Sequence, residues 1–122
     1  MDIDDFIPVM NEQAPPALRK LGGRIHAFDD ESGTVEMRYT LDDSFTHSGG
    51  IVQGGYVTGM LDAAMAHAVI ARFRRYVVVA SLDIKVNFLQ IARPGELTAY
   101  ARPQRLGKSI GFLEAELHDE QG

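Results

Sequence analysis

Residues 49–71 read GGIVQGGYVTGMLDAAMAHAVIA, a glycine-rich turn followed by small apolar residues that surround one acid, Asp62. This stretch predicts a helix beginning near Gly54, and a helix that is apolar on nearly every side is normally buried. A carboxylate inside such a helix loses hydration, which is costly unless another group satisfies or uses it. The amides of Gly54 and Gly55 lie at the helix start, where backbone N–H groups favour negative charge. The stretch therefore predicts an acid and an anion-stabilising amide on one helix.

Period-two alternation on both sides of this helix predicts an antiparallel sheet. We expect strands over residues 24–29, 34–41, 78–88, 96–105 and 109–118. The alternation is clearest in residues 78–88, and Pro103 requires an edge, a bulge or a missing ladder bond at its position. One long helix against an antiparallel sheet is an α+β fold.

The composition indicates a single domain over residues 1–122, with residues 1–20 as a helix or coil extension that Pro8 and the pair Pro15–Pro16 break. The formal net charge is −5 and no stripe of lysine or arginine is present, so we expect no nucleic-acid partner. No stretch has the length and apolarity of a membrane span.

The chain has no cysteine, which fits a cytoplasmic protein, and its first residues are acidic where a secretory signal is basic. His26 and His118 lack ligand spacing, and His67 fits a core or interface histidine. We therefore expect no metal site and no cofactor.

Residues 47–69, HSGGIVQGGYVTGMLDAAMAHAV, resemble the signature of hotdog-fold acyl-CoA thioesterases, in the phenylacetyl-CoA thioesterase-like branch. That signature reads Asn-x-x-Gly-x-x-His-Gly-Gly, with an Asp nine residues after the His. Residues 81–117 resemble the family's third strand, its Ala-x-Pro-Gly turn and its next hairpin. The resemblance implies a hotdog fold, in which a curved antiparallel sheet wraps one long central helix. It also implies a homodimer or a dimer of dimers.

The family pattern further leads us to expect one more strand after residues 119–122, which in related proteins lies inside the sheet. Either the sequence continues beyond these residues, or another element takes that place.

The resemblance carries over to individual residues. Gly54 and Asp62 fall on family positions, and Ser81 falls where many members have Ser or Thr near the bound thioester. His47 stands where the family usually has Asn, and Gln53 stands where it has His. Gln53 donates and accepts hydrogen bonds but does not titrate near neutral pH, which leaves His47 as the candidate substitute.

Gly54 and Asp62 are too far apart on one helix to act on one carbon. Eight residues span about 12 Å, whereas an attacking group must lie within about 3–3.5 Å of the carbonyl carbon. Two antiparallel helices across a twofold axis remove this difficulty, because Gly54 of one subunit then faces Asp62 of the other. We therefore expect two composite sites per homodimer.

The expected reaction is hydrolysis of an acyl-CoA thioester with an aryl or medium-length acyl group. The Gly54 N–H stabilises the oxyanion, and Asp62 acts as a general base or as a nucleophile. Ser81 positions the water, and Gln53 orients the carbonyl. The candidate substrate-binding residues are Gly55, Tyr56, Met60, Phe88, Arg93, Arg105 and Lys108, with Arg72, Arg74 and Arg75 as further cations.

Two other functions remain open at this stage. The same fold serves non-hydrolytic acyl-CoA binding or sensing modules, and a purely structural dimerisation domain is the second alternative. Release of free thiol from acyl-CoA distinguishes hydrolysis from both.

Overall fold

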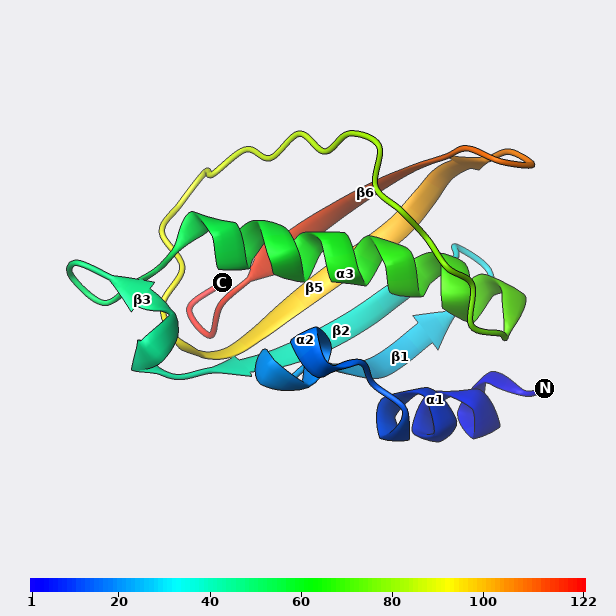
Figure 1. The fold of residues 1–122 in the computed structure, drawn as a ribbon, viewed down its shortest axis with the longest axis horizontal. Coiled ribbons are helices and arrows are strands. Elements are labelled where there is room, and N and C mark those ends of the chain that lie inside the picture. The colour runs from blue at the N-terminus through cyan, green and yellow to red at the C-terminus, as the bar shows by residue number, and fades with distance from the viewer.

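The computed structural model describes residues 1–122 and has one long helix lying across a four-stranded antiparallel sheet (Figure 1). The helices are α1 (Ile3–Glu12), α2 (Pro16–Lys20) and α3 (Gly54–Phe73), and η1 (Asp43–Phe45) is a 3-10 turn. The main sheet has the order β1 (Arg24–Asp29), β2 (Thr34–Leu41), β5 (Gly95–Leu106), β6 (Gly111–His118). A separate hairpin joins β3 (Thr46–His47) to β4 (Ile51–Val52). This arrangement confirms the predicted α+β class. None of the helices combines the length and the apolar character that a membrane span requires.

The core lies between α3 and the inner face of β2 and β5, the two central strands. Alternate side chains of β2 are buried, including Val35, Met37 and Tyr39, as the period-two pattern predicted. Alanines are fully buried on both surfaces, at positions 99 and 101 of β5 and 64 and 68 of α3. Small side chains on both sides allow the helix to lie close to the sheet.

Pro8 does not break the N-terminal helix, so that expectation is wrong. Pro8 lies inside α1, where proline removes one helical hydrogen bond. The helix is held by tertiary contacts instead, because Phe6 and Met10 are buried in the core. Asn11 also fixes α1 to the sheet edge, since its side-chain amide donates to the Ile25 carbonyl at 2.9 Å and accepts from the Ile25 N–H at 2.7 Å. These contacts compensate for the lost bond.

The predicted strand over residues 78–88 is also wrong. We call residues 76–91 the strap, and they run as an irregular loop beside α3 (Figure 1). No backbone N–H or C=O of the strap forms a hydrogen bond within the chain. A strand exists only with a hydrogen-bonded neighbour, and no strand of the chain pairs with these residues. Their alternating apolar side chains are largely exposed, with Val78 84% and Leu82 81% accessible.

Pro103 lies where the sequence requires it. The pairing of β2 with β5 ends at Val35 and Ala101, so Pro103 is beyond the central part of the sheet. The register of the β5–β6 pair shifts between Pro103 and Arg105, which is the expected bulge.

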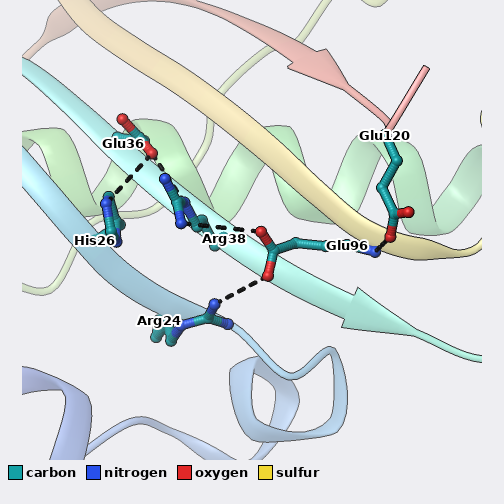
Figure 2. A network of polar contacts seen from close by, with 6 residues as sticks. All are labelled: Arg24, His26, Glu36, Arg38, Glu96 and Glu120. Carbon is teal, nitrogen blue, oxygen red and sulfur yellow. Dashed lines mark hydrogen bonds and ion pairs between the residues drawn. The ribbon is translucent and has the colours of Figure 1, made fainter. Parts of the chain in front are cut away.

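The sheet face turned away from α3 carries a network of ion pairs (Figure 2). Glu36 accepts from the Arg38 Nε at 2.9 Å, and Glu96 accepts from Arg24 at 3.2 Å. His26 lies 3.9 Å from Glu36. Partly exposed pairs of this kind contribute about 0–1 kcal/mol each. The network therefore serves as a polar solvent-facing surface, and no cluster of three metal-binding side chains is present.

Candidate active site

The first turn of α3 presents an unpaired backbone amide. Gln53 is the N-cap residue, and its side-chain carbonyl accepts the Gly55 N–H at 2.8 Å. The Gly54 N–H has no acceptor in the chain. A free amide at a helix N-terminus is suited to an oxyanion or a carbonyl oxygen. A Cβ at position 55 would lie 2.8 Å from the Gln53 Oε1, so a larger residue there would displace the capping side chain.

The loop before α3 is held by backbone and arginine contacts. The Gln53 N–H donates to the Phe45 carbonyl at 3.0 Å. Gly49 and Gly50 have φ values of +79° and +69°, a conformation that favours glycine. The Arg93 guanidinium donates to the Gly49 carbonyl at 2.5 Å. Arg93, one of the candidate substrate-binding residues, therefore holds this loop in place.

Asp62 lies on the side of α3 turned away from the sheet, about two helical turns after Gly55 at the helix start. The Ser81 hydroxyl donates a hydrogen bond to its carboxylate, which joins the strap to α3. Asp62 is half-buried rather than buried, because α3 covers the sheet with one face only. Within one chain α3 is therefore buried on one face only, and burial of its other face stays a prediction. The pairing of Asp62 with Ser81 is a contact that the structure supplies.

Tyr39 is a core residue that binds the helix turn just before Asp62, and the sequence did not single it out. Its hydroxyl donates to the Met60 carbonyl of α3 at 2.7 Å. Burial raises the pKa of Tyr39, and the negative charge of Asp62 raises it further. Tyr39 therefore stays neutral and links β2 to the helix turn that precedes the acid. Its inward position in the β2 alternation is the only sequence signal for this role.

Three of the candidate substrate-binding residues, Phe88, Tyr56 and Met60, have different surroundings in the structure. The Phe88 ring of the strap covers Gly54, since a Cβ there would lie 3.3 Å from two ring atoms. Tyr56 is partly exposed and packs edge-to-face on Phe45, with ring centroids 4.9 Å apart. Met60 is fully buried in the core. Its side chain belongs to the core cluster and exposes no surface to a ligand within this chain.

Three further sequence candidates lie away from these groups. His47 is exposed in the β3–β4 hairpin, and its side chain makes no hydrogen bond to Asp62, Ser81 or Gln53. Arg105 and Lys108 are exposed at the β5–β6 hairpin, at the end of the molecule opposite β3 (Figure 1). They are free to meet a ligand but touch neither Gly54 nor Asp62.

Of the three arginines at the end of α3, Arg74 has a structural role. Arg74 is the C-cap of α3, with φ +53°, and its guanidinium donates to both carboxylate oxygens of Asp30 at 2.6 and 2.7 Å. It also stacks on Phe28 at 5.4 Å from the ring centroid. These contacts occupy Arg74, whereas Arg72 and Arg75 are exposed.

His67 is buried in the core side of α3, as the simplest reading of its position predicted. Its Nδ1 lies 2.8 Å from the Ala63 carbonyl, one turn earlier in the helix. Burial lowers the pKa of His67, so the ring is neutral near pH 7 and donates through Nδ1. His67 is thus a buried side chain that donates a hydrogen bond to the backbone of its own helix.

Comparison with known proteins gives one family. Residues 49–122 match the model of the thioesterase superfamily. A Pseudomonas aeruginosa protein assigned as an esterase, PA1618, is 33% identical over 105 residues, which cover 84% of this chain and 70% of that protein. A Ralstonia eutropha JMP134 protein, described as a thioesterase related to phenylacetic acid degradation, is 34% identical with a TM-score of 0.80. That alignment covers 96% of this chain and 90% of the other.

The fold is shared more widely than the sequence. The Escherichia coli PaaI protein, from the phenylacetic acid degradation operon, is 21% identical with a TM-score of 0.80. The alignment covers 98% of this chain and 83% of PaaI. At 21% identity this similarity shows a shared fold and nothing more. The architecture of a long central helix on an antiparallel sheet is thus the hotdog fold.

Proposed function

Because the chain belongs to the thioesterase superfamily, and is a thioester hydrolase, we propose that it cleaves an acyl-CoA with an aryl or medium-length acyl group. The observation that carries the proposal is the hydrogen bond from Ser81 to Asp62 on a helix whose first amide has no acceptor. The described role of the Ralstonia eutropha relative in phenylacetic acid degradation supports an aryl group.

In the proposed reaction the thioester carbonyl accepts the Gly54 N–H. The negative charge that develops on this oxygen is stabilised by the amide and by the helix dipole. Loss of one such donor typically costs about 3–4 kcal/mol of transition-state stabilisation. The Gln53 side-chain NH2 has no acceptor in the chain, so it is available as a second donor.

Asp62 serves the attack in one of two ways. As a general base it takes a proton from water while the water oxygen bonds to the carbonyl carbon, and the tetrahedral intermediate then expels the CoA thiolate. As a nucleophile it forms a mixed anhydride with release of the thiolate, and water hydrolyses the anhydride. Ser81 orients the carboxylate in both routes.

A composite site follows from the separation of the two groups. Gly54 and Asp62 are eight residues apart in α3, or about 12 Å along the axis. We place Gly54 of one subunit opposite Asp62 of its partner, which gives two equivalent sites in a homodimer or a dimer of dimers. The exposed Arg105 and Lys108 are the proposed contacts of the CoA phosphates.

The substitution Asp62→Asn tests the proposal. We expect kcat to fall by about 10²–10⁴-fold, since loss of a general base or nucleophile has an effect of this size. Acyl-CoA binding should persist, because the amide keeps the shape of the side chain. Thiol release is measured over aryl, short, medium and long acyl-CoAs, and binding by calorimetry.

Asp83→Asn is the matched control, because Asp83 is an exposed acid of the strap two residues from Ser81. It should leave turnover near the wild-type value. Retained turnover in Asp62→Asn would remove Asp62 from the reaction, and binding without thiol release in the wild type would indicate an acyl-CoA-binding module instead.

A further inference from the structure

The hairpin that leads into α3 is held in place by the residues at the start of β5. We call residues 46–53 the entry hairpin and residues 92–96 the corner, which follows the strap (Figure 1). The Val52 N–H donates to the Ala92 carbonyl at 2.9 Å. This hydrogen bond joins the entry hairpin to the corner directly before Gln53, the N-cap of α3.

The Arg93 side chain makes the second connection between the corner and the entry hairpin. Its Nη1 donates to the Gly49 carbonyl at 2.5 Å and to the Gly50 carbonyl at 3.3 Å. Both glycines have positive φ, and glycine backbone is less restricted than that of any other residue. None of the ion pairs of the chain includes Arg93. The guanidinium is therefore directed at the part of the entry hairpin that most needs a restraint.

The main chain of Arg93 is itself held by the residues that follow β6. The Asp119 carboxylate accepts the Arg93 N–H at 3.0 Å and the Gln121 N–H at 3.0 Å. The Glu120 carboxylate accepts the Glu96 N–H at 2.7 Å. Two carboxylates thus fix the corner, and with it the point from which the Arg93 side chain extends.

We infer that Arg93 is a positioning residue for the oxyanion donor, because its guanidinium holds the entry hairpin so that the Gly54 N–H stays aimed at the thioester carbonyl. The inference rests on the proposed function, in which that amide stabilises the oxyanion. A reacting group misplaced by about 1 Å lowers the rate by up to about 100-fold. Arg93 acts on the reaction through the main chain of the entry hairpin and does not contact the substrate.

Arg93→Ala, assayed with two thioesters, tests this role. One substrate is an aryl acyl-CoA, and the other has the same acyl group on N-acetylcysteamine, which lacks the phosphates of CoA. A residue that aims the oxyanion donor acts on both substrates, so kcat/KM should fall by about tenfold with each. With acyl-CoA the loss should lie in kcat, with little change in KM. A phosphate contact would instead affect acyl-CoA alone, chiefly through KM.

Arg19→Ala is the matched control. Arg19 is also exposed, and its guanidinium also donates to two backbone carbonyls, those of Ala14 at 2.7 Å and Glu12 at 2.8 Å. These contacts join α1 to α2, outside the candidate site. The control variant should lose stability and keep kcat near the wild-type value with both substrates.

Arg93→Lys is a second variant that keeps the positive charge. The lysine nitrogen lies one bond closer to the main chain than the arginine Nη1, so it falls short of the two carbonyls. The variant should therefore keep most of the loss in kcat. Lysine would restore a phosphate contact, because it binds phosphate as a point charge.

Hydrogen exchange measures the restraint on the entry hairpin independently of turnover. The amides of Gly50, Val52 and Gln53 are hydrogen-bonded to backbone carbonyls in the structure. In Arg93→Ala they should exchange about fivefold faster or more, since a loosened segment opens more often. Arg19→Ala should leave their exchange unchanged.

The contrary outcomes are distinct. A loss confined to acyl-CoA, or full recovery in Arg93→Lys, would make Arg93 a charge contact of the substrate. Unchanged kcat with both thioesters, or unchanged amide exchange, would mean that the entry hairpin keeps its position without Arg93. If any of these occurs while wild-type hydrolysis depends on Asp62, the inference fails and the proposed function stands. If the wild-type protein releases no thiol, the proposed function fails, and the inference fails with it.

Discussion

At the scale of single residues, the surroundings of Asp62 depend on which neighbours stay neutral. Burial keeps Tyr39 protonated, so its hydroxyl remains a donor to the Met60 carbonyl near the acid. Burial likewise favours the neutral form of His67. The only charge that α3 carries between Gly54 and Ala71 near pH 7 is therefore that of Asp62. An uncharged helix surface around one carboxylate is suited to an acid that works on an apolar substrate.

The lowered pKa of His67 predicts an acid-dependent loss of stability. The ordinary pKa is 6.5, and burial holds the folded-state pKa below it. As the pH falls below 6.5, His67 becomes protonated in the unfolded chain but stays neutral in the folded chain. The free energy of unfolding therefore decreases until the pH reaches the folded-state pKa. His67→Gln removes this titration and should lose less stability between pH 7 and 5.5.

Urea unfolding of both proteins at the two pH values measures the difference. The other histidines are common to both chains, so their contributions cancel. An equal loss in the two proteins would mean that His67 does not couple folding to pH in this range.

The sequence identified most catalytic candidates but could not say which of them meet. Gly54 and Asp62 were found because a glycine at a helix start and an acid in an apolar helix are local signals. The contact of Ser81 with Asp62 spans 19 residues of sequence, and the contact of Phe88 with Gly54 spans more. No local pattern encodes such contacts. Burial of Met60 and exposure of His47 were likewise decided by which face each element turns to the core.

At the scale of elements, the end of α3 depends on a single residue in an unusual conformation. Arg74 has φ +53°, in the left-handed region that normally suits glycine. Its side chain compensates through the Ala71 carbonyl, Asp30 and the Phe28 ring. The pair with Asp30 is partly exposed, so much of the benefit comes from the backbone contact and the stacking.

Two substitutions separate the backbone strain of Arg74 from its side-chain contacts. Arg74→Ala loses the contacts and keeps the strain, and should lower the free energy of unfolding by about 1–2 kcal/mol. Arg74→Gly loses the same contacts but removes the strain, so it should be less destabilising by about 1 kcal/mol. Chemical denaturation of the two variants measures this difference. If the glycine variant is the less stable one, the left-handed cap carries no strain.

The strap marks the limit of element prediction from periodicity. Its alternation is the strongest in the chain, and yet residues 78–88 form no strand. Alternation shows that one side of a segment is apolar, but a strand also needs a neighbour to receive its hydrogen bonds. By contrast, β1 and β2 have the predicted bounds, because they lie next to each other and share a short turn.

At the scale of the whole molecule, the proposed composite sites tie activity to assembly. A single chain holds the acid and the free amide too far apart, so an isolated subunit should be inactive. Specific activity should therefore fall as the protein is diluted through its dimer dissociation constant. Initial rates over a dilution series, with sedimentation at the same concentrations, measure this dependence. Full specific activity in a preparation shown to be monomeric would rule out shared sites.

The sequence by itself determined the α+β class, the bounds of β1 and β2, the start of α3 and the two groups that it carries. These follow from local rules of periodicity, turn chemistry and glycine placement, which act within a few residues. Only the tertiary structure decided that Pro8 stays within α1, that residues 78–88 lack a partner, and that Ser81 and Phe88 reach the helix. The reason is that segments distant in the chain provide the hydrogen-bond partners and bury the side chains. A local sequence pattern does not contain information about these distant segments.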